Sequence, residues 1–332
     1  MATVSEATIK AQKDTAWAQV KRHWSNDQRA KADSVQRVYA DQFYQYYRAH
    51  PDTETGKDVL ETAFAMWGNT GAADKVDEVL AHIDRDSDVW AGIVIGIMNA
   101  YASAARESED DPERARKKAR QKWLPLLEEL NKDLSDPISR SMVLRQLGEH
   151  YQREGDVTRA QSLFEDMLSL QADTFHVEYA EGALYEIESL RVGLPAPDFT
   201  AETIEGDTVK LSDLKGEVVL LEFWATWCGP CLPDIPHLKK LHEKYGDQNF
   251  QLVGVSLDYE LSELEQFVDS LDMAWPQVWQ EKAWEGPVAE LYNVTGIPDS
   301  YLIDQDGKIV AKDIDAEKLD EAVGELLAAP QE

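Results

Sequence analysis

The 332-residue sequence contains only two cysteines, Cys228 and Cys231, and both lie in the stretch FWATWCGPCLPDIP. So few cysteines exclude a disulfide-rich scaffold. Long apolar runs are also absent, because no segment approaches the roughly 18 consecutive apolar residues of a membrane-spanning helix. The N-terminal MATVSEATIKAQKDTAWAQV has neither the apolar core nor the cleavage site of a signal peptide. The sequence therefore predicts no transmembrane segment, and a cytoplasmic chain if Met1 is native or an extracytoplasmic one if a leader was removed.

Basic residues are scarce as well. The chain has 33 Lys and Arg against 63 Asp and Glu, which gives a net charge of −30 at pH 7. Residues 191–332 carry 10 against 29, a net −19, whereas residues 1–190 carry 23 against 34, a net −11. Such a field repels nucleic acid and anionic membranes, so neither is expected as a partner. The acidity is typical of a solvated, salt-adapted surface or of a surface for basic proteins, and both interpretations stay open.

Residues 1–190 have the periodicity of helices. Apolar residues recur every three or four positions in AWAQVKRHWSNDQRAKADSVQRVYADQFYQYYRAH, and strand-like alternation is scarce. Further helices are expected near residues 56–68, 72–84, 88–105, 112–132, 137–153 and 157–171. Gly, Asp and Pro separate them, as at Asp111-Pro112 and Asp136-Pro137. This half is therefore predicted to be an all-α domain of antiparallel helix pairs.

One of these pairs has a more specific pattern. Its marker residues are Leu147, Gly148 and Tyr151 on the first helix, Gly155 in the turn, and Ala160 and Phe164 on the second. This spacing resembles a tetratricopeptide repeat, although Ala172 stands where the repeat usually has proline. We expect an irregular tetratricopeptide-like array. Stacked helix pairs often present a surface for a protein partner, and the alternative is a helical domain that only packs on its neighbour.

After Leu190 the sequence pattern changes from helical periodicity to alternating strands and helices. A continuous apolar run, VVLLEFW, is typical of a strand that is buried on both faces of a sheet. Hairpins are expected at 199–216 and 299–313, strands at 218–224 and 250–258, and helices at 232–246, 261–272 and 317–329. Residues 191–332 are therefore predicted to form an α/β domain with a partly parallel sheet, following an all-α domain at 1–190.

The cysteine pair is consistent with part of a metal site, a structural disulfide or a redox centre. Zinc needs four ligands, and the nearest histidines, His237 and His242, are five apart and do not share a helix face. A structural disulfide that spans only two intervening residues removes little entropy from the unfolded chain and so stabilises the fold little. Redox chemistry remains, and a redox-active disulfide between Cys228 and Cys231 requires neither a metal nor another cofactor.

The local sequence also favours a reactive thiol. We expect the strand to end at Trp227 and a helix to begin at the cysteine pair, which places Cys228 at a helix N-terminus, where a thiolate is stabilised. Pro230 at an early helical position removes no needed N–H. Cys231, one turn further on and more buried, is placed to attack a mixed disulfide formed on Cys228.

Glu222 is the most informative residue outside the pair, because it interrupts the apolar strand. Burial there raises the pKa of a carboxyl group, so that Glu222 could accept and return the proton of Cys231. The alternative is a glutamate that reaches water at the end of the strand. Trp224, Trp227 and Pro233 are expected to shape and cover the site.

The motifs VGLPAPDF, LSDLKGEVVLLEFWATWCGPC, VGVSLD and VTGIPDSYLIDQDG make residues 192–328 similar to the TlpA/ResA-type thiol–disulfide oxidoreductases of the thioredoxin superfamily. The resemblance implies a thioredoxin fold, a location outside the cytoplasm, and a cis Ile297–Pro298 peptide bond facing the cysteines, with a loop that pairs with the substrate backbone. The substrate groove would then include Trp227, Gly229, Pro230 and Ile297. Asp299 stands where close relatives have Thr or Ser, which would add a negative charge near this groove.

These observations lead to two hypotheses. In the first, the chain is an enzyme that acts on protein thiols and disulfides, with Cys228 as nucleophile, Cys231 as resolving cysteine, Glu222 as proton relay and Pro298 in the substrate loop. The Gly229-Pro230 dipeptide, as in thioredoxin, favours a protein-disulfide reductase. In the second, the helical half is a protein-binding adaptor, and the thioredoxin-like domain is mainly structural or gives redox control.

Overall fold

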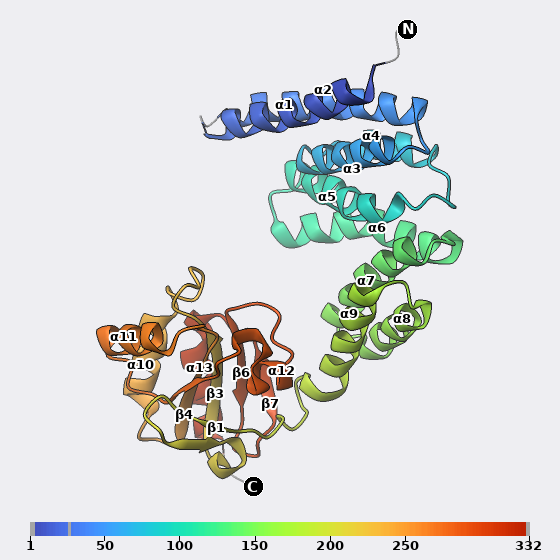
Figure 1. The fold of residues 1–332 in the computed structure, drawn as a ribbon. Helices are drawn as coiled ribbons and strands as arrows, with labels where there is room; N and C mark the ends of the chain where they lie inside the picture. Colours follow the sequence, from blue (N-terminus) through green and yellow to red (C-terminus); the bar gives the residue numbers. More distant parts are fainter. Residues whose placement is uncertain (1–3, 26–27, 330–332) are drawn as a thin grey trace. The chain divides into compact units, whose positions relative to one another are not determined.

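The computed structural model describes residues 4–25 and 28–329, and the chain divides into two compact units, residues 1–181 and 182–332 (Figure 1). The sequence predicted the boundary at 190/191. The difference arises because the segment after residue 181 contacts the C-terminal unit. The Tyr185 hydroxyl donates to the carbonyl oxygen of Leu291 at 2.9 Å, and Lys312 forms an ion pair with Glu186.

The first unit consists of helices, as predicted. They are α1 (Glu6–Ser25), α2 (Arg29–Ala49), α3 (Glu54–Asn69), α4 (Ala73–Leu80), α5 (Trp90–Ser108), α6 (Pro112–Asp133), α7 (Pro137–Arg153), α8 (Val157–Leu170) and α9 (Thr174–Tyr185), whose last turn belongs to the second unit. The Asp-Pro pairs start helices: Asp111 and Asp136 each cap a helix whose first residue is proline. Helix α9 and the π-helical turn Glu186–Leu190 lie beyond the predicted helical ranges.

The helix pair α7–α8 shows why its small residues are needed. A Cβ atom on Gly148 would lie 2.6 Å from ring carbons of Phe164, so only glycine lets the two helices approach this closely. Gly155 adopts φ +81° in the intervening turn, a conformation that favours glycine. The predicted antiparallel hairpin is confirmed for this pair.

The second unit is built on a five-stranded sheet with the order β5-β4-β3-β6-β7. Its strands are β3 (Val218–Trp224), β4 (Phe250–Ser256), β5 (Gln277–Trp279), β6 (Asp299–Ile303) and β7 (Ile309–Lys312). The central strand β3 is parallel to β4 and antiparallel to β6. Every residue of β3 is buried, as its continuous apolar sequence predicted. The predicted partly parallel α/β fold is confirmed.

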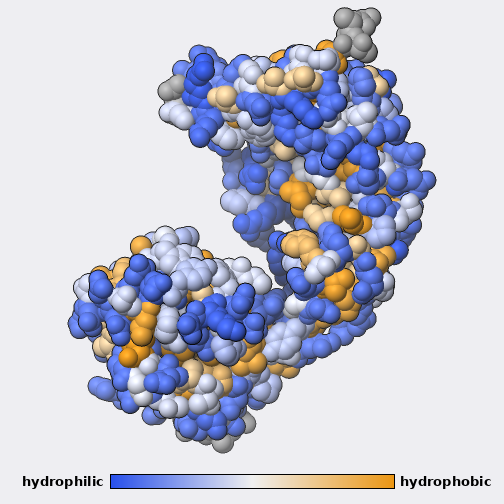
Figure 2. All heavy atoms as spheres, in the orientation of Figure 1, coloured by the Kyte–Doolittle hydropathy of each residue, from blue (hydrophilic) through white to orange (hydrophobic). Residues whose placement is uncertain are grey.

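Helices complete this unit. Helices α10 (Ile235–Tyr245) and α13 (Ala316–Ala328) pack on each other and on the central strands, and α11 (Leu261–Leu271) and the short α12 (Pro287–Leu291) follow β4 and β5. A separate hairpin joins β1 (Thr200–Glu202) to β2 (Thr208–Lys210). Polar residues dominate the face drawn in Figure 2. Within the described residues, none of the helices has the length and apolar character needed to cross a bilayer.

Candidate active site

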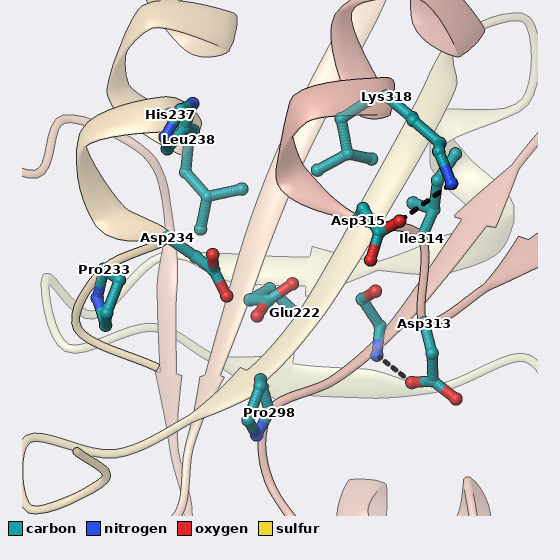
Figure 3. Close-up of a pocket in the computed structure, with 12 residues that line it drawn as sticks. Glu222, Pro233, Asp234, His237, Leu238, Pro298, Asp313, Ile314, Asp315 and Lys318 are labelled. Carbon is teal, nitrogen blue, oxygen red and sulfur yellow. Dashed lines mark hydrogen bonds and ion pairs between the residues drawn. The ribbon is translucent and has the colours of Figure 1, made fainter. Parts of the chain in front are cut away.

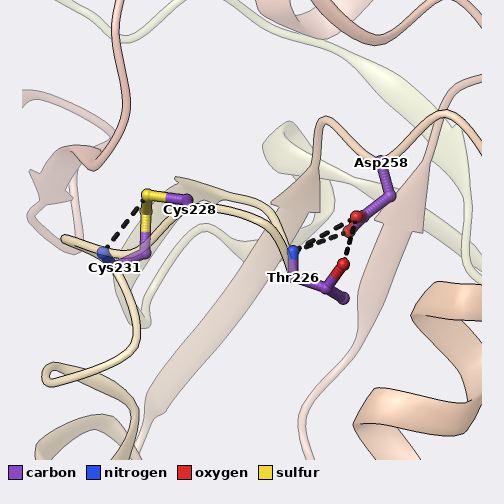
Figure 4. The surroundings of a disulfide bond; sticks show 4 residues. All are labelled: Thr226, Cys228, Cys231 and Asp258. Carbon is purple, nitrogen blue, oxygen red and sulfur yellow. Dashed lines mark hydrogen bonds between the residues drawn. A yellow bond between two sulfur atoms is a disulfide. The ribbon is translucent and has the colours of Figure 1, made fainter.

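The two cysteines form a disulfide in the segment that connects β3 to α10 (Figure 4). Their Cα atoms are 5.3 Å apart. Both residues are buried, with 4% of Cys228 and 2% of Cys231 exposed. The Cys231 N–H donates a hydrogen bond of 3.2 Å to the Cys228 sulfur. A backbone N–H directed at this sulfur also stabilises negative charge on it when the disulfide is reduced.

The predicted helix start at the cysteine pair is wrong. Strand β3 ends at Trp224, where the predicted apolar run 218–224 ends, and does not continue to Trp227, and α10 begins only at Ile235. Residues 228–234 form successive turns, with i→i+3 hydrogen bonds from Cys231 to Cys228 and from Asp234 to Cys231. The reason is the proline spacing: Pro233 and Pro236 have no N–H to complete the first α-helical hydrogen bonds. The group directed at the Cys228 sulfur is therefore the Cys231 N–H of this turn and not the N-terminus of an α-helix.

A buried carboxylate holds the loop that leads to Cys228. Asp258, which is fully buried at the end of β4, accepts hydrogen bonds from the Thr226 hydroxyl at 2.6 Å and from the Thr226 N–H at 3.1 Å (Figure 4). The Ser256 hydroxyl donates a further bond of 2.8 Å to the same carboxylate. Asp258 is not among the site residues predicted from the sequence. Its position directly after a buried strand could have indicated this role, because the carboxyl ends of the parallel strands β3 and β4 meet at one edge of the sheet.

The loop before β6 contains the proline expected opposite the cysteines. The Ile297–Pro298 peptide bond is cis, which confirms that expectation. Pro298 lines the same cavity as Pro233, two residues after Cys231 (Figure 3). The structure therefore brings the proline loop and the cysteine segment to one region.

Glu222 lies at the inner wall of this cavity, which has a volume of about 520 Å³. Burial raises the pKa of Glu222 well above its ordinary value, and the nearby carboxylates of Asp234, Asp299 and Asp313 raise it further. Figure 3 shows Glu222 and Asp234 pointing toward one another. The cavity also contains Lys318, whose ammonium group is paired with Asp315. Glu222 is thus a buried carboxyl group with an opening toward solvent, and the alternative of a strand-end glutamate is wrong because the residue is only 6% exposed.

Asp299 does not supply the full negative charge that the sequence predicted. Burial, and then the neighbouring Asp313 carboxyl, raise the pKa of Asp299 to about 8. One of its carboxylate oxygens, Oδ1, is buried with no hydrogen-bond partner among the described residues. The side chain therefore carries less negative charge near neutral pH than an ordinary aspartate, and it becomes charged as the pH rises through about 8.

Aromatic residues surround the exposed side of the disulfide segment. Trp227 is 49% exposed, stacks on Tyr259 with ring centroids 6.4 Å apart, and lies 6.2 Å from Trp284. Gly229 and Pro230 are exposed beside it, whereas Ile297 is partly buried. Trp224 is buried, and its indole N–H donates to Gln277. Trp227 is therefore accessible to another molecule, and Trp224 belongs to the core.

Comparison with known proteins agrees with this geometry. Residues 192–312 match the AhpC/TSA family. The chain is 33% identical over 146 residues to the thiol-disulfide oxidoreductase ResA of Bacillus cereus, covering 44% of this chain and 83% of that protein. The chain belongs to the ResA-like thiol–disulfide oxidoreductases. It is also 34% identical over 143 residues to the thioredoxin-like protein YneN of Bacillus subtilis, covering 40% and 80% of the two chains.

Among solved structures, the thioredoxin domain of a thiol-disulfide oxidoreductase from Bacteroides vulgatus is 33% identical, with a TM-score of 0.39 over 42% of this chain and 99% of that one. The match to the AhpC/TSA family leaves the helices of residues 1–191 outside it. In the described residues of this ResA-like chain, no group of three or more His, Cys, Asp or Glu side chains is arranged to hold a metal ion.

Proposed function

We propose that this ResA-like chain is a protein-disulfide reductase whose reaction passes through a mixed disulfide on Cys228. The observation that supports this most directly is the Cys228–Cys231 disulfide beside the loop of Pro298. An N–H group directed at the Cys228 sulfur favours its thiolate. The Gly229-Pro230 dipeptide, which is the same as in thioredoxin, supports a reductase over an oxidase.

The proposed reaction begins with the reduced pair. The Cys228 thiolate attacks one sulfur of a substrate disulfide, and the other substrate sulfur leaves and takes up a proton. The thiolate of Cys231 then attacks the Cys228 sulfur, which releases the second substrate thiol and forms the Cys228–Cys231 disulfide. A dithiol donor reduces this disulfide and returns two electrons and two protons. The cysteine pair carries the electrons, so the reaction needs no metal or organic cofactor.

Glu222 is proposed to relay the proton of Cys231. A carboxyl group with a raised pKa is a better match to a thiol than an ordinary carboxylate is, because proton transfer is efficient between groups of similar pKa. The cavity at Glu222 would let the proton exchange with solvent. Trp227, Gly229, Pro230 and Ile297 are proposed to contact the substrate, and Pro298 to present the backbone with which the substrate pairs.

The reduction of insulin by dithiothreitol tests the redox function. The wild-type chain should accelerate this reaction, and Cys228→Ser should abolish the acceleration. Cys231→Ser should trap a mixed disulfide with the substrate, which gel electrophoresis without reductant detects. Equal rates for the wild type and Cys228→Ser would contradict the proposal. The reduction potential of the cysteine pair separates a reductase from an oxidase.

A second role is proposed for the helical unit, namely the binding of a protein partner. Its support is the packing of successive helices into hairpins, with Gly148 against Phe164 as one close contact. A partner that is captured by the full chain and also by residues 1–190 alone would support this role. Capture by the full chain only would contradict it.

A further inference from the structure

The helical unit contains a strongly basic segment in an otherwise acidic chain. Between residues 114 and 122 of α6, six of nine residues are Lys or Arg and none is acidic, although the chain carries a net charge of −30. Most of these side chains are exposed. A local excess of positive charge in an acidic chain creates a positive potential that attracts anionic groups.

The basic segment lines a cavity of about 960 Å³, which we call the basic cavity. Its charged lining consists of Arg114, Arg116, Lys117 and Arg120 of α6, Arg153 at the end of α7, and the acidic Asp111, Glu113 and Glu154. Trp123 and His150 also line it and are themselves largely buried, with their rings 5.2 Å apart in an edge-to-face arrangement. The cavity thus combines a cationic rim with an aromatic wall.

Several of its cations lack a counter-charge. In residues 4–25 and 28–329, no ion pair is formed by Arg114, Arg116 or Lys117. Arg120 is paired with Glu154. The acidic Asp111 is occupied as a helix cap, because its carboxylate accepts from the Arg114 N–H at 2.8 Å. Three exposed, unpaired cations on neighbouring turns of one helix therefore remain available for a ligand.

The arrangement favours a chain of carboxylates over a compact anion. A single phosphate is usually held by converging groups or by free N–H groups at a helix N-terminus, but Asp111 already caps α6. The unpaired cations are instead spread along the exposed surface of the helix. The acidic charge of the rest of the chain repels any long polyanion, which favours a short acidic segment over a nucleic acid. The aromatic wall supplies apolar surface that a polypeptide can use through a non-polar side chain.

We propose that the basic cavity binds an acidic polypeptide segment of a partner protein. Carboxylates of the segment pair with Arg114, Arg116 and Lys117, and an apolar side chain of the segment packs against Trp123. This inference rests on the proposed partner-binding role of the helical unit and is independent of the redox chemistry.

The test uses the full-length chain and a fluorescein-labelled oligoglutamate peptide with one central leucine, followed by fluorescence anisotropy. Saturable binding that weakens as salt concentration rises is expected. The double variant Arg116→Glu, Lys117→Glu should bind about tenfold or more weakly, because charge-assisted contacts are lost and repulsion replaces them. The matched control, Lys21→Glu with Lys31→Glu, has the same charge change on α1 and α2, outside the basic segment and the cavity, and should bind within about twofold of wild type.

Equal weakening in the two double variants would overturn the proposal, because the effect would then reflect net charge. Displacement of the peptide by inorganic phosphate at similar concentration, or equally tight binding of single-stranded DNA, would also overturn it. A wild-type dimer in sedimentation that the cavity variant lacks would assign the site to a second copy of this chain and likewise contradict a separate partner. Far-ultraviolet circular dichroism checks that the variants fold. If the charge-reversal variant Arg116→Glu, Lys117→Glu does not fold, the neutral variant Arg116→Gln, Lys117→Gln takes its place. Partner capture that persists in the cavity variant would reject this site but leave the binding role of the helical unit intact.

Discussion

The Asp258 carboxylate accepts hydrogen bonds from both the N–H and the hydroxyl of Thr226, two residues before Cys228. The two residues come from the ends of neighbouring parallel strands, so this contact ties the cysteine loop to the sheet. Asp258 is fully buried and also accepts from Ser256. We infer that Asp258 positions the loop without touching the substrate.

Asp258→Asn should therefore disturb the cysteine loop. The amide NH₂ would face donors, which leaves a buried N–H or hydroxyl group unpaired at a cost of about 1–3 kcal/mol. We expect slower insulin reduction and a shifted reduction potential of the cysteine pair. Thr226→Ser keeps the hydroxyl group and should behave like wild type, whereas Thr226→Val should shift the potential in the same direction as Asp258→Asn. A loss of stability with an unchanged potential would assign Asp258 a purely structural role.

Glu222→Gln should change stability in a pH-dependent way. The pKa of Glu222 is raised in the folded chain by burial and by the carboxylates of Asp234, Asp299 and Asp313. Between the unfolded and folded pKa values the folded chain binds the extra proton, so wild-type stability falls as pH rises through this window. Glutamine has no such proton, so the stability of the variant relative to wild type should rise as the pH increases above the ordinary glutamate pKa, until the raised pKa of Glu222 is reached. Urea unfolding at each pH measures this difference, which can grow by at most about 1.4 kcal/mol per pH unit.

The same variant tests the proton relay. Insulin reduction by Glu222→Gln should be slower by at least about tenfold near neutral pH, because Cys231 loses its proton acceptor. Glu222→Asp keeps a carboxyl group and should recover part of the rate. Identical pH–rate profiles for wild type and Glu222→Gln from pH 6 to 9 would refute the relay.

Asp299→Asn should remove an inflection near pH 8 from the pH dependence of KM. Burial and Asp313 raise the pKa of Asp299 to about 8, so the side chain gains its negative charge as the pH rises through about 8. In wild type, this charge appears directly after Pro298 and should weaken the binding of substrates with acidic residues near the cysteine. For an acidic model peptide disulfide, we expect wild type and Asp299→Asn to have similar KM values at pH 7. At pH 9 the KM of wild type should be higher than that of the variant. A basic peptide is the matched control and should show no such increase.

Much of the redox unit could be predicted from the sequence because its signals are local. The buried run of β3, the expected hairpin at 299–313 and the cysteine spacing each act over a few residues. The short strand β5 and helix α12 were missed, since three to five residues carry too little periodicity. The predicted start of α10 was too early, because Pro233 and Pro236 lack the N–H groups that the first helical turns need.

Contacts between distant segments were beyond the sequence. Asp258 meets Thr226 only because β4 lies beside β3 in parallel register. The pKa of Asp299 depends on Asp313, which follows a different strand. The basic cavity likewise needs the end of α7 to lie beside the first turns of α6. Such relationships follow from tertiary packing, which no local pattern encodes.

Gly148→Ala tests the close contact inside the helical unit. Alanine has the higher helix propensity, by about 1 kcal/mol, so an exposed site would be stabilised. Here the new Cβ atom would lie 2.6 Å from the Phe164 ring, and forcing the ring away costs about 1–3 kcal/mol. We expect net destabilisation of the helical unit in urea unfolding followed by circular dichroism. Insulin reduction reports on the other unit and should be unchanged.

A double-mutant cycle separates the clash from other causes. Phe164→Leu alone should destabilise the unit because it removes buried ring atoms. In the Phe164→Leu background, Gly148→Ala should cost less or become stabilising, since leucine leaves room for the added methyl group. The same cost in both backgrounds would show that Phe164 is not what restricts position 148. The helical pair would then owe its close approach to other contacts.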